Sequence, residues 1–410
     1  MKTVPTLLLG LAVLLVGCES DAPLGPDESP LLHRDRAGSP ALTVVTYNVY
    51  WGAYVEELLL VDPTQIPIVA AQLWGDIQAT DFNQRAEAIA DQIESADAHV
   101  IGLQEIALYR FEPESDYAPG GPVPPPDAED VLLDFLAILT DALEARGLYY
   151  DVASSSENMD IELPMCTTEI CYPLADIRLT DYDVVLVQED VAWTNPLDGN
   201  FAAALPIDIG GQVLYKPSGW ASVDITYKGL PYRFVNTHLE PADMGGVLIP
   251  DLVGLQAMQL EELMGIVDAS PYPVIMVGDF NSDDDGSTTA TYQAVRDSGF
   301  VDAWLIGRPR GSGYTSNQAP DLMNEVSELF HRIDFIFYGD EFTAAKGKFQ
   351  GSVAAELLGE EQADRTTPDG LWPSDHAGVA ATLRIAPGRK GPRHSAHRKS
   401  GKWRGGKNYR

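Results

Sequence analysis

The chain has 410 residues, enough for one large domain or two modest ones. Its formal net charge of −34 describes an acidic protein, which repels polyanions unless basic groups or bound cations act locally. The charge therefore counts mildly against a tight nucleic-acid binder and leaves open a hydrolase that carries its own cations. Solubility or adaptation to a salty medium is the simplest explanation of the acidity.

The first 18 residues have the pattern of an export signal. Lys2 precedes an apolar run over residues 7–16 that is too short to span a bilayer as a helix. The run ends at Gly17-Cys18, which resembles a bacterial lipobox and predicts a lipidated Cys18 at the mature N-terminus. We expect an exported lipoprotein anchored to a membrane in the periplasm or at the cell surface. A non-lipidated secretory signal, and hence a secreted protein, is the alternative.

Three further segments follow this signal. Residues 19–40 are rich in Pro, Gly, Ser, Asp and Glu and predict a disordered tether. Residues 41–387 alternate strands and helices without a dividing linker and are expected to form one domain. Residues 388–410 hold nine Lys or Arg and no acid, which predicts a basic disordered tail. The tail is either an arm attracted to anionic surfaces or a solvated segment without a defined role.

Two cysteines remain when Cys18 is set aside. Outside the cytosol, Cys166 and Cys171 can form a disulfide that closes a short loop. A two-cysteine metal site is the alternative, but no histidine lies nearby in the sequence to complete its ligand set.

The predicted elements alternate between strands and helices without strict order. Strands are predicted at residues 42–47, 100–103, 183–187, 232–237, 274–277, 333–338 and 379–383. Helices are predicted at residues 85–93, 131–143 and 252–266, and a Pro- and Gly-rich loop at 112–127. Because some strands follow one another directly, the pattern favours a layered α/β sandwich over a barrel or a doubly wound sheet.

Polar side chains stand where several of the apolar runs end. Asn48, Glu105 and Asp279 each follow such a run, and Asn281 lies two positions after Asp279. Each alone is an ordinary turn or loop residue, but oxygen donors of this kind are the ligands that Mg²⁺ or Mn²⁺ prefers. A divalent metal neutralises the non-bridging oxygens of a phosphate ester during hydrolysis. We therefore expect these strand ends to converge on a metal-dependent phosphoesterase site.

Two histidines stand near acids or at strand ends. Asp375-His376 precedes the last predicted strand, and Asp334 is an acid inside another apolar strand. An Asp–His pair would fix the tautomer of His376 and stabilise its protonated form, which could then bind the scissile phosphate. His238 ends a further strand and could bind phosphate or protonate the leaving oxygen.

Six short motifs, taken in order, resemble those of the endonuclease/exonuclease/phosphatase superfamily, the fold of pancreatic deoxyribonuclease and neutral sphingomyelinases. They are Tyr47-Asn48, Gln104-Glu105, Thr237-His238-Leu239, Gly278-Asp279-Phe280-Asn281-Ser282, Arg332-Ile333-Asp334 and Ser374-Asp375-His376. The resemblance spans roughly residues 42–385. It implies a four-layer α/β sandwich in which helices flank two packed mixed β-sheets.

The resemblance also implies a role for each matched residue. Glu105 would be the main ligand of Mg²⁺ or Mn²⁺, assisted by Asn48 and Asp375. Asp279 would orient the attacking water. The groups that contact phosphate would be Asn281, His238 and His376, with Asp334 supporting His376.

One position departs from the family pattern. Some members carry an acid two residues after the asparagine, where this chain has Tyr50, so the resemblance supplies no second ligand from this strand. Arg178 and Tyr182 are weaker candidates for the substrate side. Residues 50–80 and 108–180 exceed what a minimal core requires, and we expect them to build the rim that recognises the substrate.

The expected activity is hydrolysis of a phosphodiester or phosphomonoester outside the cytoplasm by a monomer. Nucleic acid, phospholipid and inositol phosphate all stay open as substrates. A catalytically silent surface-binding module on the same fold is the alternative. A serine hydrolase is not indicated, because no G-x-S-x-G motif occurs.

Overall fold

The computed structural model describes residues 41–59, 61–118, 124–209, 212–244, 247–307, 309, 311–339, 353–366 and 368–384. The predicted export signal with Cys18, the tether and the basic tail lie outside these residues. Within the described part of the chain, no helix is long and apolar enough to cross a bilayer.

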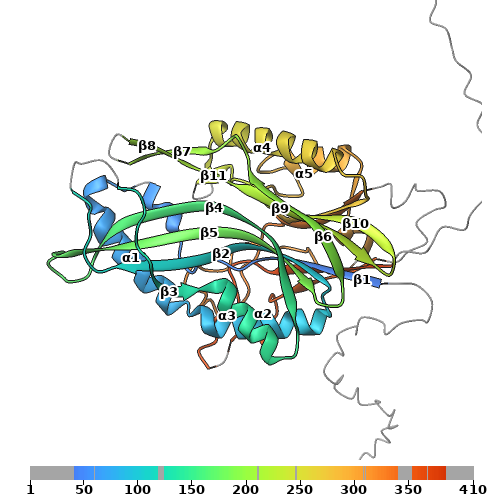
Figure 1. Ribbon diagram of the computed structural model, residues 1–410, viewed down its shortest axis with the longest axis horizontal. Coiled ribbons are helices and arrows are strands. Elements are labelled where there is room, and N and C mark those ends of the chain that lie inside the picture. The colour runs from blue at the N-terminus through green and yellow to red at the C-terminus, as the bar shows by residue number, and fades with distance from the viewer. Residues whose placement is uncertain are drawn as a thin grey trace, which may run out of the picture. The chain divides into compact units, whose positions relative to one another are not determined.

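Two mixed β-sheets form the centre of the described domain (Figure 1). The first has the order β16-β17-β1-β2-β5-β4, with β3 paired to β2, and the second has the order β14-β15-β13-β10-β9-β6. Strands β1 and β2 run parallel, as do β10 and β13, whereas the other neighbours run antiparallel. The first sheet consists of β1 (Ala41–Asn48), β2 (Val100–Glu112), β3 (Asp130–Asp134), β4 (Tyr150–Cys166), β5 (Leu174–Gln188), β16 (Val353–Leu358) and β17 (Gly378–Arg384). The second consists of β6 (Ala192–Asn200), β9 (Gly219–Tyr227), β10 (Leu230–His238), β13 (Val274–Asp279), β14 (Phe300–Asp302) and β15 (Asp334–Gly339).

Shorter strands and the helices complete the described elements. Two small hairpins pair β7 (Leu205–Ile209) with β8 (Gln212–Lys216) and β11 (Asp243–Met244) with β12 (Val247–Leu248). The α-helices are α1 (Ile66–Ala79), α2 (Phe82–Ala96), α3 (Phe135–Ala145), α4 (Pro250–Asp268), α5 (Thr291–Asp297) and α6 (Ala303–Gly307). The 3₁₀ turns are η1 (Val55–Leu59), η2 (Pro63–Gln65) and η3 (Gln362–Asp364).

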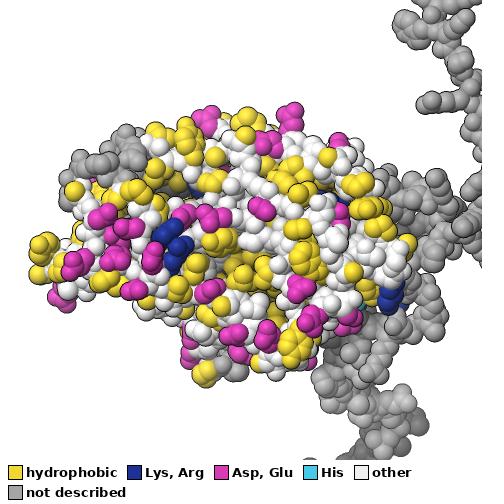
Figure 2. Space-filling model, viewed as in Figure 1, with side chains coloured by type: hydrophobic (Ala, Val, Ile, Leu, Met, Phe, Trp, Pro, Cys, Tyr) yellow, Lys and Arg dark blue, Asp and Glu magenta, His cyan; other side chains and the backbone are white. Residues whose placement is uncertain are grey.

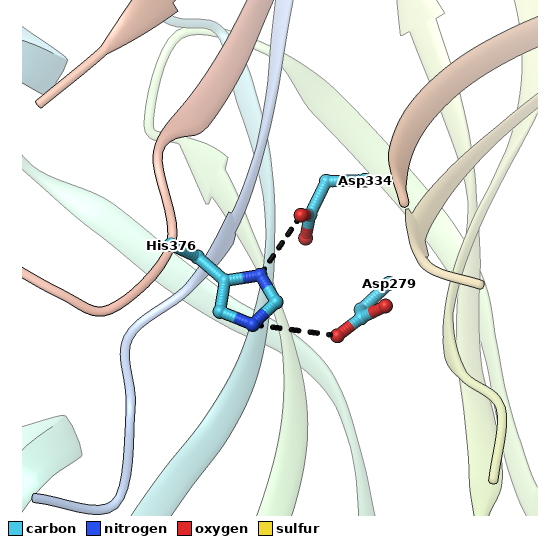
Figure 3. A group of neighbouring side chains, drawn as sticks. All are labelled: Asp279, Asp334 and His376. Atoms are coloured by element: carbon cyan, nitrogen blue, oxygen red, sulfur yellow. Dashed lines mark hydrogen bonds and ion pairs between the residues drawn. The ribbon is translucent and has the colours of Figure 1, made fainter. Parts of the chain in front are cut away.

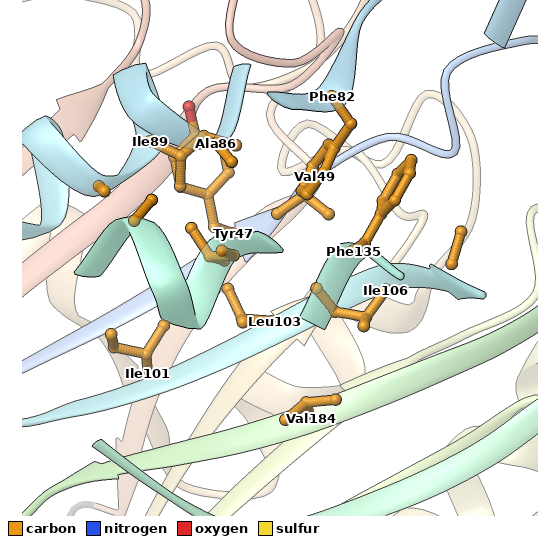
Figure 4. Close-up of a cluster of buried hydrophobic side chains, with 14 of the residues drawn as sticks. Tyr47, Val49, Phe82, Ala86, Ile89, Ile101, Leu103, Ile106, Phe135 and Val184 are labelled. Carbon is orange, nitrogen blue, oxygen red and sulfur yellow. The ribbon is translucent and has the colours of Figure 1, made fainter. Parts of the chain in front are cut away.

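The core lies in three layers between the helices and sheets. Side chains from α1, α2 and α3 pack on the outer face of the first sheet. Phe82 and Phe135 stack there (Figure 4), and their ring centroids lie 3.6 Å apart. A second cluster fills the space between the two sheets, and a third packs α4 and α5 on the outer face of the second sheet. This order of helix, sheet, sheet and helix confirms the predicted four-layer α/β sandwich.

Strand β1 explains why the central strands are apolar at nearly every position. Val45 and Tyr47 face the helices, whereas Leu42 and Val44 face the second sheet. Successive side chains of a strand point to opposite faces, and here both faces are covered. The same run therefore supplies two cores.

The predicted helix over residues 131–143 is wrong in its first part. Residues 130–134 instead form β3, which pairs with β2, and Val131 and Leu132 are exposed. The helix begins at Phe135 because Asp134 is its N-cap, where Oδ1 accepts a hydrogen bond of 3.0 Å from the Ala137 amide.

The prediction that a strand ends just before Glu105 is also wrong. Strand β2 continues to Glu112 and is irregular between Leu103 and Ile106, where its pairing with β5 shifts register. Glu105 has a φ of 61° at this bulge. A bulge redirects a side chain within a strand, so Glu105 reaches the site from the middle of β2.

Acidic side chains are spread over the face of the domain that Figure 2 shows, and basic ones are few there. The sulfur atoms of Cys166 and Cys171 are bonded across the turn that follows β4.

Candidate active site

Strand pairing brings the predicted residues together from both sheets. In the first sheet, Asn48 lies opposite Gln104, next to Glu105. In the second, Asp279 lies between His238 on β10 and Asp334 on β15. Asn48, His238 and Asp279 are the last residues of the inner strands β1, β10 and β13.

Asn48 links the two carboxylates at the centre of the site. Its Nδ2 donates to Glu105 Oε1 at 2.8 Å and to Asp279 Oδ2 at 3.2 Å. Its Oδ1 accepts from the Tyr50 amide at 3.0 Å, and Glu105 Oε2 accepts from the Trp51 amide at 2.9 Å. The carboxylates of Glu105 and Asp279 therefore face the same space from different sheets.

A second group consists of Asp279, Asp334 and His376 (Figure 3). His376 Nδ1 lies 2.8 Å from Asp334 Oδ2, while its Nε2 points toward Asp279 Oδ2 at 3.9 Å. Ser316 Oγ lies 3.3 Å from the same Nε2. His376 is thus oriented by Asp334 and presents its other nitrogen to the site.

The surroundings of His376 favour its charged form. Burial lowers the pKa of this imidazole, but the charges of Asp334 and Asp375 and the hydrogen bond to Asp334 outweigh burial and hold the pKa well above its ordinary value. His376 is therefore a cation near neutral pH.

His238 has the opposite charge state. Burial, with smaller contributions from Lys216 and His376, lowers the pKa of His238 to about 3. Its Nε2 lies 3.2 Å from Asn281 Nδ2 and 3.6 Å from Asp279 Oδ2. A neutral imidazole can contact a phosphate as a neutral hydrogen-bonding group, but it carries no proton to spare for a leaving oxygen.

Asp279 is fully buried, and burial followed by the charge of Asp334 raises its pKa to about 7. The turn after β13 holds it in place, because Asp279 Oδ1 accepts from the Asn281 amide at 2.8 Å. Gly278 permits this turn: its φ is 148°, and a Cβ there would lie 1.9 Å from the Thr237 carbonyl oxygen.

Asp375 lies at the edge of this arrangement. Burial raises the pKa of its carboxyl, and Ser374 Oγ lies 3.4 Å from Asp375 Oδ1. The same hydroxyl donates to the Asn48 carbonyl at 2.8 Å. The Ser374-Asp375-His376 motif is therefore tied to the end of β1.

Arg178 and Tyr182, the weaker candidates, are engaged elsewhere. Arg178 donates to Asp160 at 2.7 and 2.6 Å, and the Tyr182 hydroxyl donates to Glu157 at 3.2 Å. Both partners belong to β4, so the structure does not bring these two side chains to the residues above.

Two acids of β5 were missed by the sequence analysis. Asp181 and Asp183 are buried, and Asp181 accepts from Trp51 Nε1 at 2.8 Å. Burial, followed by the charge of Asp181 and smaller effects of Glu105 and Asp279, holds the pKa of Asp183 well above its usual range. The signal in the sequence was a pair of acids two positions apart beside an apolar run, which places both on one face of the strand.

Arg85 was also missed, although it is fully buried beneath the site. Its guanidinium donates to the carbonyls of Val49 at 2.6 Å, Tyr50 at 3.1 Å and Pro373 at 3.1 Å. These bonds join the segment after Asn48 to the segment before Ser374. Burial lowers the pKa of Arg85 to about 10, which still leaves it charged.

The donor set fits a hard divalent cation. Carboxylate oxygens of Glu105 and Asp279 share one space, and the side-chain amide of Asn48 lies between them. Buried carboxylates without a full set of cations around them are costly, and a divalent ion would offset that cost.

Comparisons with known proteins agree with this geometry. The sequence model of the endonuclease/exonuclease/phosphatase family matches residues 174–376. An endonuclease/exonuclease/phosphatase family protein from Bacteroides thetaiotaomicron has a similar structure, with a TM-score of 0.52 and 16% identity over 85% of this chain and 100% of that chain. A mannosyl-6-phosphatase from the same organism gives a TM-score of 0.50 and 18% identity over 83% and 99% of the two chains. TDP2 from Caenorhabditis elegans gives 0.45 and 15% over 84% and 97%. No curated protein matches the sequence.

At these identities the solved structures support the fold alone, and the match to the sequence model supports the assignment to the family. The chain belongs to the endonuclease/exonuclease/phosphatase family, whose members are phosphoester hydrolases. The matched range contains His238, Asp279, Asn281, Asp334 and His376, whereas Asn48 and Glu105 precede it.

Proposed function

We propose that the protein is an exported, divalent-metal-dependent phosphoesterase that hydrolyses a phosphodiester by attack of water. The observation that carries this proposal is the hydrogen bonding of one amide, Asn48 Nδ2, to carboxylates from both sheets, Glu105 and Asp279. The cationic His376 stands beside them. A binding module would have no use for this combination.

Glu105 would hold Mg²⁺ or Mn²⁺, with Asn48 and Asp375 assisting. The bound ion would neutralise charge on the phosphate oxygens. The affinity for the ion depends on ionised carboxylates. Asn48 Nδ2 donates a hydrogen bond to both Glu105 and Asp279, which is compatible with both carboxylates being ionised.

The remaining residues divide the work on the phosphate. Asp279, with its raised pKa, accepts a proton from the attacking water as the water oxygen bonds to phosphorus and the bond to the leaving oxygen breaks. Protonated His376 binds a non-bridging oxygen, and Asp334 fixes its tautomer. Asn281 and neutral His238 position the same phosphate.

The substitution Glu105→Gln tests the central role. It keeps the shape of the side chain but removes the charge that holds the cation, so Mg²⁺-supported hydrolysis of bis-p-nitrophenyl phosphate should fall by at least about 100-fold. Glu94→Gln, on the exposed side of α2, is the matched control and should retain full activity. EDTA should abolish the activity of the unmodified protein. Near-normal turnover by Glu105→Gln would reject the ligand role, and no turnover by the unmodified protein would favour the silent binding module.

We further propose that the protein is anchored to a membrane through a lipid on Cys18, as the lipobox-like sequence suggests. Cys18→Ser should move the protein from the membrane fraction to the soluble fraction of the cell that makes it, as measured by fractionation and immunoblotting. Unchanged membrane retention would contradict the anchor.

A further inference from the structure

A cavity lined almost wholly by apolar side chains lies between α1 and the ends of β4 and β5, and it has a volume of about 80 Å³. A single water needs about 10–15 Å³ of such a volume. The cavity therefore has room for several carbon-sized groups. Its walls come from η1, α1, β2, β4, β5 and the β7–β8 hairpin.

Strand alternation builds the floor of the cavity. Ile161 and Leu163 of β4 lie opposite Leu179 and Ile177 of β5, and residues two apart on a strand share a face. Helix α1 packs against β4 and contributes Leu73 and Trp74 to the opposite wall (Figure 1). These walls lie within the two segments that exceed a minimal core, residues 50–80 and 108–180.

Trp51 joins the cavity to the catalytic residues. Its side chain lines the cavity, while its amide donates to Glu105 Oε2 at 2.9 Å. Trp51 therefore contacts both the cavity and the carboxylate of Glu105.

Lys216 gives the cavity its cationic end. It lines the cavity, its Nζ lies 5.9 Å from the Trp51 ring, and it pairs with Glu240 at 2.9 Å. Its charge also contributes to the lowered pKa of His238. The end of the cavity that Lys216 lines thus holds a cation that is paired with the buried Glu240.

Several wall residues are only half-buried, including Val55, Leu58, Ile161 and Ile207. The cavity is therefore bounded by side chains that solvent also reaches, and a ligand group can enter without unfolding the sheet.

We propose that this cavity binds the alkyl chain of a phosphate ester whose phosphate lies at Glu105, Asp279 and His376. The proposal rests on the phosphoesterase function proposed above and names its substrate class. An apolar chain with an anionic head matches an apolar cavity with a cation at one end. A nucleobase would leave its hydrogen-bonding groups unpaired against these walls.

A series of alkyl p-nitrophenyl phosphodiesters with methyl, butyl, hexyl and octyl groups tests the proposal in the presence of Mg²⁺. Each buried methylene is worth up to about fourfold in binding, so kcat/KM should rise steeply with chain length until the cavity is full. Equal kcat/KM for the methyl and hexyl esters would overturn the proposal, as would a dinucleotide turned over faster than any alkyl ester.

Two variants localise the effect to the cavity. Ala70→Phe should fill it, and Ile207→Gln should place an amide in its wall, so both should lose the preference for long chains and retain turnover of the methyl ester. The matched controls are Ala137→Phe on the exposed face of α3 and Val213→Gln on the exposed face of the β7–β8 hairpin, which should keep the preference. A preference that survives both cavity variants would place the chain elsewhere.

A binding measurement separates this proposal from the catalytic one. Octyl phosphate, below its micelle concentration, should change the fluorescence of Trp51 and Trp74 and bind at least about tenfold more tightly than methyl phosphate, whether or not any ester is hydrolysed. If no ester is turned over but octyl phosphate binds in this way, the catalytic proposal fails and the cavity proposal stands. Equal binding of the two phosphates refutes the cavity proposal alone.

Discussion

The two histidines of the site show how surroundings set the charge of a side chain. His376 is bonded to the carboxylate of Asp334 and remains charged, whereas burial keeps His238 neutral, with its Nε2 beside the amide of Asn281. Both rings point at Asp279 Oδ2, at 3.9 and 3.6 Å. One charged and one uncharged imidazole therefore stand beside the same carboxylate, and under the proposed function both would contact the phosphate.

The substitution Asp334→Asn should change the pH dependence of the reaction. Asp334 raises the pKa of His376, and the charged form persists below that pKa and is lost as the pH rises through it. Without the carboxylate the pKa falls, so the alkaline limb of the kcat profile should move to lower pH by at least about one pH unit. The measurement is kcat against pH for both proteins at saturating Mg²⁺, and coincident alkaline limbs would show that His376 does not act as a cation.

At the scale of elements, buried hydrogen bonds join the segments that carry the candidate site residues. Arg85 reaches from α2 to the carbonyls of Val49, Tyr50 and Pro373. Beneath the same site, Gln104 Nε2 donates to Asn236 Oδ1 at 2.6 Å across the two sheets. Gly102 allows this approach, because a Cβ there would lie 2.6 Å from that oxygen.

Replacing Arg85 with Lys should therefore cost both stability and activity. Lysine keeps the charge but cannot reach three carbonyls at once, and each buried carbonyl left unpaired costs about 1–3 kcal/mol. Urea denaturation should report a loss of at least about 2 kcal/mol. Arg146→Lys, at the end of α3, is the control: its carboxylate partners Glu87 and Asp91 are exposed, so it should lose less than about 1 kcal/mol. Equal stabilities of the two variants would refute the linking role.

The sequence predicts the strands and helices whose apolar pattern has a single period. The predictions are wrong where tertiary contacts determine the local structure. Strands β1, β10, β13 and β17 and helices α2 and α4 cover their predicted ranges, and β15 begins one residue later than predicted. The apolar pattern of residues 131–143 mixed a strand with a helix, because Val131 and Leu132 fit the helical spacing by coincidence. The bulge at Glu105 depends on pairing with β5, which no local pattern encodes.

For the site, the structure brings the acids and histidines of the motifs together, but the motifs gave no account of how these residues are held. Arg85 lies in a helix where an isolated arginine normally suggests a solvated face, so only the structure identifies its buried role. The place of Asp183 near Glu105 is likewise seen only in the structure, because it depends on the register of β5 against β2.

At the scale of the whole molecule, the domain buries several of the acids that contribute to its negative charge. Asp181, Asp183, Asp279 and Asp334 are all at most 2% exposed. Burial raises the pKa of Asp279 to about 7. The folded protein therefore loses stability as the pH rises through that value and this carboxyl ionises. A divalent cation should offset this cost.

Mg²⁺ should accordingly raise the thermal unfolding midpoint, and more so at pH 8 than at pH 6. At 100 times its dissociation constant, a ligand adds about 2.7 kcal/mol, which corresponds to a few degrees for a domain of this size. Scanning calorimetry with Mg²⁺ and with EDTA measures the shift, and the same scans on Glu105→Gln should show little of it. A midpoint that does not respond to Mg²⁺ at either pH would contradict a cation at this site.

The neighbours of β1 have a consequence for how the protein is made. On one side β1 pairs with β2, but on the other it pairs with β17, where Thr43 Oγ1 lies 3.1 Å from Thr382 Oγ1 across 339 positions of sequence. At about 5–20 residues per second, a ribosome needs roughly 20 to 70 s to deliver that last partner. During this interval β1 keeps an open edge, and completion of its sheet waits until β17 has been synthesised.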